Sequence, residues 1–377
     1  MPAQKKIALF TDTYDQVNGV ANTFKYLTQY SVKHNRRLDI YTHADGSDSI
    51  EERGTVRILR YKPTIPIDIY FDMIFDLKFP RFRILSECKK QNYDVIHTAT
   101  PGSMGLNALI VAGSDIPLIG SYHTSIPEYV RERVEKIVKK FNLPTEHSGE
   151  RSEDGTWEYM KWYYNRCRVV LAPSEHTKST LEKKLNTKIR IFSRGIDIER
   201  FNPGFSTKHD GVIVLYVGRV SIEKNLGVLT KIFKNRSDAK LTIVGDGPYL
   251  AEMKSACPHA EFQGFLGGQD LSRAYASSDI FVFPSTTDTF GNVVLEAMSS
   301  GLPVIVTDKM GPKELVREGE NGFIAADDEE FEKKLNILIE DKNLRQKMGA
   351  NARDYAQSRS WDAEFDALYA CYEEFAK

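Results

Sequence analysis

Short apolar runs alternate along the first half of the chain with stretches in which apolar residues recur every three or four positions. The runs lie at residues 7–10, 37–41, 56–61, 94–97 and 117–121. Runs of this length, separated by helical patterns, are typical of strands in a parallel sheet. The alternation predicts βαβ units and a doubly wound α/β domain.

A second series with the same pattern follows and includes an irregular stretch at 188–209, which combines glycine, proline and charge. Its apolar runs lie at 169–172, 212–217, 240–244, 280–283 and 303–306. We therefore predict two similar domains, residues 1–190 and 191–357, with a hinge near Arg194 and Gly195. The total of 377 residues suits two domains of ordinary size.

Charge and cysteine content exclude several classes of protein. The 51 Lys and Arg residues balance 52 Asp and Glu residues, so no overall field favours nucleic acid. The four cysteines lie far apart, which argues against a zinc site or a disulfide framework and favours a reducing cytoplasm. No apolar run reaches the length of a membrane-spanning helix, and the N-terminus resembles a first strand rather than a signal peptide.

Two segments outside this pattern have their own character. Residues 142–158 are polar and acidic, and we predict a mobile loop there. Residues 131–140, RERVEKIVKK, form a basic amphipathic stretch. A solvated helix face is the main interpretation of this stretch, and contact with the surface of a membrane is the alternative.

In doubly wound sheets, ligands bind beyond the carboxyl ends of the strands. The loop after the first strand ends in Asn18-Gly19, where a helical pattern begins. A glycine at a helix N-terminus lets backbone N–H groups approach an anion. The same residues also suit a plain strand-to-helix turn.

The loop after 212–217 carries Arg219 and Lys224 on either side of a predicted helix start. Arginine binds phosphate through two hydrogen bonds and lysine binds it as a point charge, so the pair could hold a diphosphate. Two exposed basic residues in a loop are the alternative interpretation.

The loop after 280–283 leads into a helix with two carboxylates. Asp288 precedes the helix, and Glu296 lies within it among apolar neighbours. A carboxylate in such a place needs polar partners, and sugar hydroxyls are suitable. N–H groups near 290–292 could bind phosphate. Capping by Asp288 and solvent exposure of Glu296 are the alternatives.

His123 directly follows the strand at 117–121, and His97 holds a similar position after 94–96. Either histidine could be structural, but the end of a strand favours a site role for His123. Gly245-Asp246-Gly247-Pro248 departs from a dinucleotide-binding fingerprint because Leu250 replaces its third glycine. P-loop, zinc-protease and hydrolase motifs are absent from the sequence.

Together these segments resemble glycosyltransferase family 4, the retaining enzymes of the GT-B fold, over nearly the whole chain. The segment from Asp288 to Glu296 is similar to the E-x7-E motif of that family, and GRVSIEKNL is similar to its phosphate-binding loop. VNGV is similar to its glycine loop. The segments TDTYDQVNGV, SYHTSIPEYV and TFGNVVLEAMSSGLPVI most resemble bacterial α-mannosyltransferases and related glycolipid glycosyltransferases.

The resemblance implies two facing Rossmann-like domains with a cleft between them, and a C-terminal helix, 358–377, that returns to the N-terminal domain. It implies that Arg219 and Lys224 hold the donor diphosphate, that Glu296 binds the nucleotide ribose and that His123 lies beside the reacting sugar. Asp288 would meet the sugar hydroxyls, although it replaces the Glu of the family and is one methylene shorter. Further donor contacts would come from Asn18, Gly19, Phe290, Gly291, Asn292 and Val293.

The implied activity is metal-independent transfer of a hexose, with mannose from GDP-mannose favoured, to a glycan or lipid-linked acceptor. UDP-glucose and other UDP-sugars are the alternative donors. No cofactor beyond the nucleotide sugar is expected, and we expect a cytoplasmic enzyme, with contact at the inner face of the membrane left open. A nucleotide-sugar 2-epimerase and a non-catalytic sugar-nucleotide binding protein are the rival interpretations.

Overall fold

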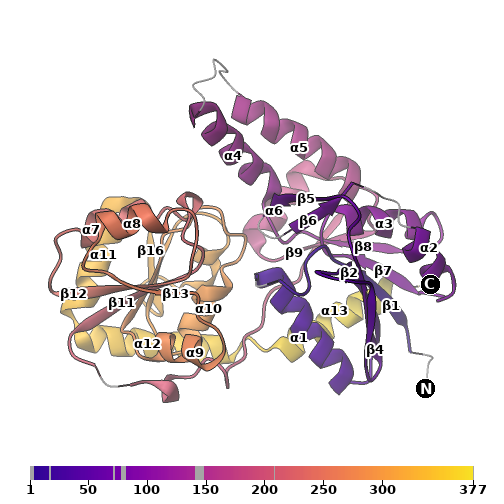
Figure 1. Cartoon of the computed structure of the whole chain (residues 1–377). Helices are drawn as coiled ribbons and strands as arrows, with labels where there is room; N and C mark the ends of the chain where they lie inside the picture. Colours follow the sequence, from indigo (N-terminus) through magenta and orange to yellow (C-terminus); the bar gives the residue numbers. More distant parts are fainter. Residues whose placement is uncertain are drawn as a thin grey trace. The chain divides into compact units, whose positions relative to one another are not determined.

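A computed structural model describes residues 4–16, 18–70, 73–77, 82–140, 148–207 and 209–376. The chain folds into two compact units (Figure 1). Unit 1 comprises Met1–Ser193 and Asp362–Lys377, and unit 2 comprises Arg194–Trp361. The sequence placed the divisions a few residues earlier, at 190/191 and 357/358.

Unit 1 is built on an eight-stranded sheet in the order β10-β9-β8-β7-β1-β2-β4-β3. Its strands are parallel except β3, which pairs antiparallel with β4 at the edge. A two-stranded β5–β6 ribbon stands apart from this sheet. The strands are β1 Lys6–Phe10, β2 Arg37–His43, β3 Ser49–Arg53, β4 Val56–Tyr61, β5 Pro66–Tyr70, β6 Met73–Asp76, β7 Val95–Thr98, β8 Leu118–Ser121, β9 Val169–Ala172 and β10 Lys188–Ile191.

Helices cover the sheet of unit 1, and the last helix of the chain is among them. They are α1 Gly19–Lys33, α2 Phe82–Lys89, α3 Ser103–Ala112, α4 Ile126–Lys140, α5 Ser148–Tyr164, α6 Glu175–Lys184 and α13 Trp361–Phe375. Helix α13 packs on α1, where the Ser31 and Tyr369 hydroxyls lie 2.9 Å apart and Lys33 pairs with Asp362 (Figure 1). The apolar stripe of α13 therefore completes the core of unit 1, as the family resemblance implied.

Unit 2 contains a six-stranded, all-parallel sheet in the order β13-β12-β11-β14-β15-β16. Its strands are β11 Val212–Val217, β12 Ala239–Val244, β13 Glu261–Gly264, β14 Ile280–Phe283, β15 Val304–Thr307 and β16 Gly322–Ala325. The strand order reverses direction between β11 and β14, which is the point where doubly wound sheets bind ligands.

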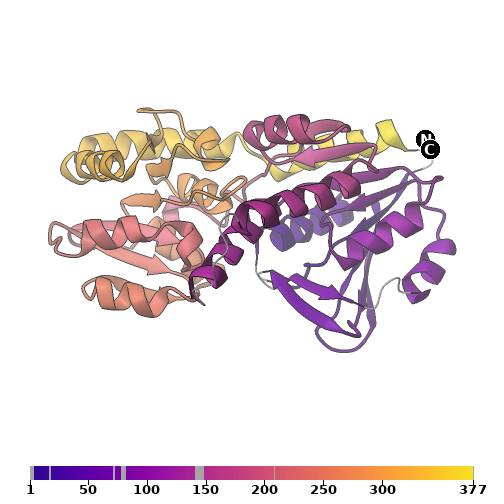
Figure 2. The same ribbon diagram turned by 90° about the horizontal axis from the view of Figure 1, so that it is seen from above.

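Helices pack on both faces of this sheet, because right-handed crossovers that run in opposite directions place their helices on opposite sides (Figure 2). The helices are α7 Gly227–Phe233, α8 Leu250–Ala256, α9 Gly268–Ala276, α10 Asn292–Ser299, α11 Asp328–Glu340 and α12 Lys342–Gln357. Short 3₁₀ turns occupy Pro203–Phe205, Ile222–Lys224 and Pro312–Leu315. Phe331, Leu335 and Leu338 form the apolar stripe of α11 and are buried in this core.

Two sequence predictions are corrected here. The segment predicted as a loop at 142–158 is helical from Ser148 onward, because Trp157 and Met160 anchor α5 in the core; residues 142–147 lie outside the described part. The irregular stretch at 188–209 begins with a strand, β10, whose KIRI sequence alternates because only one face of this edge strand is buried.

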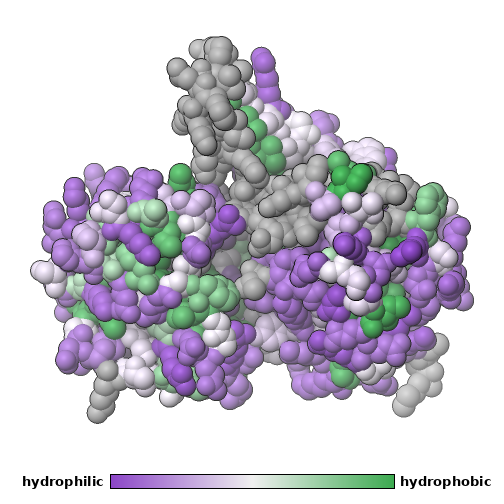
Figure 3. Space-filling view, in the orientation of Figure 1, coloured by the Kyte–Doolittle hydropathy of each residue, from purple (hydrophilic) through white to green (hydrophobic). Residues whose placement is uncertain are grey.

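The basic stretch at 131–140 is the second half of α4, which pairs with α5 as a helical hairpin (Figure 1). Arg131 bonds to Glu135 and Glu153, and the side chains of Arg133, Lys136, Lys139 and Lys140 lie outside the described residues. In the described part of the chain, we find no helix with the length and apolar character needed to cross a membrane. The face in Figure 3 is mainly hydrophilic, with scattered apolar groups.

Candidate active site

Two loops that follow neighbouring strands of unit 2, together with helix α10, carry most of the predicted site residues. Strand β11 leads into Gly218, Arg219 and Lys224, and β14 leads into Asp288. Because β11 and β14 pair in parallel, their carboxyl ends and these loops lie at the same edge of the sheet. The structure therefore brings Lys224 and Asp288 together.

Lys224 and Asp288 form a direct ion pair. The Nζ atom of Lys224 lies 2.9 Å from Oδ1 and 2.7 Å from Oδ2 of Asp288. The two side chains are 18% and 23% exposed, so the pair is partly shielded but open to a ligand. Ser285 also donates to Oδ2 of Asp288, and the Tyr216 hydroxyl donates to the carbonyl oxygen of Arg219 at 2.8 Å. These bonds fix both loops.

Glycines allow the loops at this edge to pack closely. Gly245 has a φ of +137°, and a Cβ at this position would lie 1.9 Å from the carbonyl oxygen of Gly218. Gly245 also donates its N–H to the carbonyl oxygen of Gly264 at 2.7 Å. The backbones after β11, β12 and β13 thus meet at a spacing that no other residue would permit.

Helix α10 begins at this same edge. Gly291 is its N-cap, with a φ of +85°, and a glycine has no side chain that could accept a hydrogen bond from the first turn. That turn also has no acidic residue. Its partial positive charge, near Asn292 and Val293, is therefore suited to an anion such as a phosphate.

Glu296 lies one turn further along α10, between the buried Leu295 and Ala297. It is half-buried, and the buried Tyr275 hydroxyl donates to its Oε2 at 2.9 Å. Desolvation raises the pKa of the Glu296 carboxyl above its ordinary value, while the bond from Tyr275 and the charge of Arg200 act in the opposite direction. The carboxylate is thus partly shielded from water, and this suits a residue that binds hydroxyl groups.

The remaining predicted residues belong to unit 1. Asn18 is the N-cap of α1, and its side chain accepts a hydrogen bond from Ala21 N at 2.9 Å, as in a strand-to-helix turn. Gly19 is exposed at the first position of α1, and Val17 lies outside the described residues. His123 is 9% exposed and packs edge-on against Phe24, with ring centroids 5.4 Å apart.

His97 is a core residue. Its Nδ1 lies 2.6 Å from the Tyr372 hydroxyl of α13, and its Nε2 lies 2.7 Å from the Ser121 hydroxyl. Burial lowers its pKa to about 3, so the ring is neutral at physiological pH. The structure therefore supports the structural interpretation of His97.

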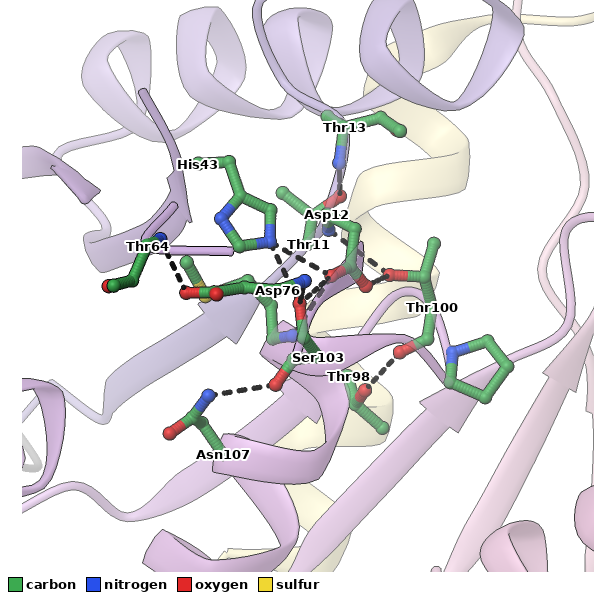
Figure 4. A network of polar contacts seen from close by, with 12 residues as sticks. Thr11, Asp12, Thr13, His43, Thr64, Asp76, Thr98, Thr100, Ser103 and Asn107 are labelled. Atoms are coloured by element: carbon green, nitrogen blue, oxygen red, sulfur yellow. Dashed lines mark hydrogen bonds and ion pairs between the residues drawn. The ribbon is translucent and has the colours of Figure 1, made fainter. Parts of the chain in front are cut away.

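A buried polar network at the carboxyl edge of unit 1 had no counterpart in the sequence predictions (Figure 4). The fully buried Asp12 accepts hydrogen bonds from Met104 N at 2.9 Å and from the Ser103 hydroxyl at 3.1 Å. Its Oδ1 lies 3.3 Å from Nε2 of His43, and Thr100 donates to its other oxygen. Asp12 thus caps helix α3 and joins the ends of β1, β2 and β7.

Comparisons with known proteins match both halves of the chain. The model of the family described as "Glycosyltransferase Family 4" matches residues 17–200. The model of the family described as "Glycosyl transferases group 1" matches residues 197–355. The sulfoquinovosyl transferase of Arabidopsis thaliana is 30% identical, covering 95% of this chain and 71% of the relative. The chain belongs to glycosyltransferase family 4.

The chain is also similar to two further proteins, one in sequence and one in structure. A GDP-mannose-dependent α-mannosyltransferase of Mycobacterium tuberculosis is 29% identical, over 98% of this chain and 96% of the relative. The structure of a sucrose-phosphate synthase from Thermosynechococcus elongatus matches with a TM-score of 0.80 at 19% identity, covering 98% of this chain and 99% of the other. The fold is therefore GT-B, with two Rossmann-like α/β domains.

Sequence reasoning missed the residues that support the site. Ser285 donates a hydrogen bond to Asp288, and Tyr275 and Arg200 lower the pKa of Glu296. None of these three residues belongs to a recognisable sequence motif. A signal existed for Ser285, which lies three residues before Asp288 in the loop after a strand. Tyr275 gives no such signal because it lies 21 residues before Glu296 and on another helix.

Proposed function

We propose that the glycosyltransferase moves a hexose from a nucleotide diphosphate sugar to an acceptor hydroxyl with retention of configuration, which gives an α-glycosidic bond. Mannose from GDP-mannose is the favoured donor. The observation that carries this proposal is the grouping of Lys224, Asp288 and the uncapped start of α10 at the point where the strand order of unit 2 reverses.

Each of these groups has a role in the proposal. Negative charge grows on the leaving diphosphate while the sugar passes through an oxocarbenium-like state. Arg219, Lys224 and the N–H groups from Phe290 to Val293 would stabilise that charge. Asp288 would accept hydrogen bonds from the sugar, and Glu296 would accept them from the ribose.

Retention follows when the acceptor attacks the face from which the diphosphate leaves. In this proposal the donor phosphate takes the acceptor proton, so no side chain serves as a nucleophile. Unit 1 would bind the acceptor, with Gly19 and His123 beside the reacting sugar. Neither unit would then be active without the other.

We also propose that the reaction needs no metal ion. Arg219, Lys224 and the helix start supply the positive charge that a divalent ion supplies in other transferases. In the part of the chain that the structure describes, no three His, Cys, Asp or Glu side chains gather as metal ligands would. The expected result is that turnover is the same with magnesium and with EDTA.

The donor is the least constrained part of this proposal. The mycobacterial relative is named for GDP-mannose, whereas the relative from Arabidopsis thaliana is named for sulfoquinovose. A UDP-sugar is the second candidate, with a glycan or lipid-linked acceptor in either case. We propose a cytoplasmic site of action, with membrane contact through 131–140 only if the acceptor is a lipid.

A thermal-shift titration tests the donor site first. The full chain is titrated without metal with GDP, UDP, ADP, GDP-mannose and UDP-glucose, as wild type, Arg219→Ala and Lys231→Ala. Lys231 is the matched control because its side chain is 76% exposed on α7 and pairs with Asp328. A rise in melting temperature with one base, lost in Arg219→Ala and kept in Lys231→Ala, would support the proposal.

Two outcomes would overturn parts of this proposal. The absence of a shift with every nucleotide would contradict a donor site in unit 2. Once a donor is known, the anomeric configuration of the first product, measured by NMR, tests retention. A β-linked product from an α-linked donor would contradict it.

A further inference from the structure

Glu296 has a partner whose position is fixed by packing. The Tyr275 hydroxyl donates to Oε2 of Glu296 at 2.9 Å, and the Tyr275 side chain is fully buried. The ring packs perpendicular to Phe201, with centroids 5.6 Å apart, and lies 5.8 Å from the ring of Phe281. Because aromatic neighbours hold the ring, the hydroxyl can serve as a fixed point for the carboxylate.

The proton in this bond belongs to the tyrosine. Burial, followed by the negative charge of Glu296, raises the pKa of the Tyr275 phenol well above its usual value. The phenol is therefore protonated throughout the range in which the enzyme could work. Tyr275 can only donate to Glu296, which leaves the remaining lone pairs of the carboxylate to accept hydrogen bonds from a ligand.

The positive charge of Arg200 acts on the same pair. It lowers the pKa of both Glu296 and Tyr275. In the described part of the chain, Nε of Arg200 is buried and has no hydrogen-bond partner. Arg200 thus favours the ionised form of Glu296 against the desolvation that opposes it.

The segment that carries Arg200 and Phe201 is itself attached to α10. Arg353 donates to the carbonyl oxygen of Phe201 at 2.8 Å, to that of Ile198 at 3.2 Å and to the Ser299 hydroxyl at 2.9 Å. Ser299 is the last residue of α10, the helix of Glu296. The supports of the carboxylate therefore form one connected set within unit 2.

We propose that Tyr275 is a positioning residue for the ribose of the donor. By holding Oε2 of Glu296, it orients the carboxylate so that the other lone pairs meet the two neighbouring hydroxyls of a ribonucleoside diphosphate. This inference rests on the proposed function, in which Glu296 is the ribose ligand. It makes the preference for ribose over deoxyribose depend on a residue that does not touch the nucleotide.

A purely structural Tyr275 would behave differently. Tyr275→Phe keeps the ring and its packing and removes only the hydroxyl. If the hydroxyl only provided a hydrogen bond to a carboxylate in the core, its loss would destabilise α10 in general. The affinity for every nucleotide would then fall to the same extent. If it orients the carboxylate, the loss of affinity is larger for ligands that carry both ribose hydroxyls than for their 2′-deoxy analogues.

The experiment is a calorimetric titration of the full chain with GDP, UDP and their 2′-deoxy analogues. Wild type is compared with Tyr275→Phe, Glu296→Gln and Tyr355→Phe. Tyr355 is the matched control because it is a half-buried tyrosine on α12 of the same unit. Circular dichroism and melting curves confirm that each variant is folded.

We expect wild type to bind the ribonucleotide about 10-fold more tightly than its 2′-deoxy analogue. Tyr275→Phe should weaken binding of the ribonucleotide by about 3- to 10-fold and weaken binding of the 2′-deoxy analogue less, because that analogue keeps only one of the two hydroxyls. Tyr355→Phe should alter neither. Ribonucleotide binding should also fall on acidification as Glu296 is protonated. The midpoint of this loss should lie at higher pH in Tyr275→Phe, because the bond from Tyr275 lowers the pKa of Glu296.

Two results separate the failure of this inference from that of the proposed function. If Glu296→Gln abolishes the ribose preference and Tyr275→Phe retains it, the positioning role of Tyr275 is wrong and the ribose role of Glu296 stands. If Glu296→Gln retains the full preference, Glu296 is not the ribose ligand and both fail. Equal weakening of both nucleotides in Tyr275→Phe also overturns the inference.

Discussion

Lys224 is paired with both carboxylate oxygens of Asp288, at 2.9 and 2.7 Å. The two residues come from loops that follow neighbouring strands. The ion pair therefore joins the residue predicted to bind phosphate, Lys224, to the residue predicted to bind the sugar, Asp288. A donor that binds as proposed must share Lys224 with Asp288. The charge of Asp288 would then weaken diphosphate binding while its oxygens bind the sugar.

Asp288→Asn should therefore separate these two effects. We expect kcat/KM to fall by about 10- to 100-fold, because a charged acceptor for the sugar hydroxyls is lost. The nucleoside diphosphate alone should bind at least as tightly as to wild type, because a competing negative charge has gone. Steady-state kinetics and calorimetry of the same preparation measure both values. Equal losses for the nucleotide and the nucleotide sugar would contradict the role of Asp288 in sugar binding.

Glu296→Gln should stabilise the protein while it weakens donor binding. Desolvation raises the pKa of Glu296 above its unfolded value, so its ionised form opposes folding. This penalty is present above the folded pKa and absent below the unfolded pKa. The melting temperature of Glu296→Gln should exceed that of wild type at pH 7, and the difference should vanish as the pH falls through this window. A variant that melts below wild type at pH 7 would disprove this account.

His97 should contribute to loss of stability in acid. Its pKa is about 3 in the folded protein, against 6.5 for an ordinary histidine, so the unfolded state binds a proton that the folded state does not. The free energy of unfolding should fall as the pH decreases from about 6.5 towards 3. Denaturant titrations at several pH values should show a shallower fall in His97→Asn.

Tyr372→Phe complements this measurement, because it removes the hydroxyl that bonds to His97 and keeps the ring. We expect a loss of about 1–3 kcal/mol in the free energy of unfolding, as for other buried hydrogen bonds left with one partner. The activity of the folded fraction should be unchanged. A fall in kcat at full folding would instead indicate a catalytic role for His97.

Gly311 should be essential for the position of the Asp288 loop. A Cβ at this position would lie 1.9 Å from the carbonyl oxygen of Thr289, and Gly311 N donates to the carbonyl oxygen of Asp288 at 3.1 Å. Gly311→Ala should displace this loop and reduce kcat/KM by about 10-fold or more. Gly227→Ala is the control, since a Cβ there has no neighbour within 4 Å. Equal activity of both variants would contradict the prediction.

The strands that could be predicted from the sequence are those that form a continuous apolar run. Central strands such as β11, Val212–Val217, are apolar along their length because both faces are covered. Edge strands such as β10 and β13 were missed, since they are short and partly exposed and their pairing depends on a distant neighbour.

The candidate site follows the same rule. Glu296 could be predicted because a carboxylate among apolar helix residues is conspicuous in the sequence. Asp12 could not, since its partners His43, Thr100 and Ser103 come from three other parts of the chain. The contacts of Tyr275 likewise exist only after α9 has packed beside α10.

The return of α13 to unit 1 sets an order for folding during synthesis. Unit 2 is one uninterrupted stretch, Arg194–Trp361, and can complete its core as soon as that stretch has left the ribosome. Unit 1 emerges earlier, but Ser31 and His97 can form their hydrogen bonds to Tyr369 and Tyr372 only after all of unit 2 has been synthesised. The unit that begins to fold first is therefore the one that finishes last, and its apolar face needs protection in the interval.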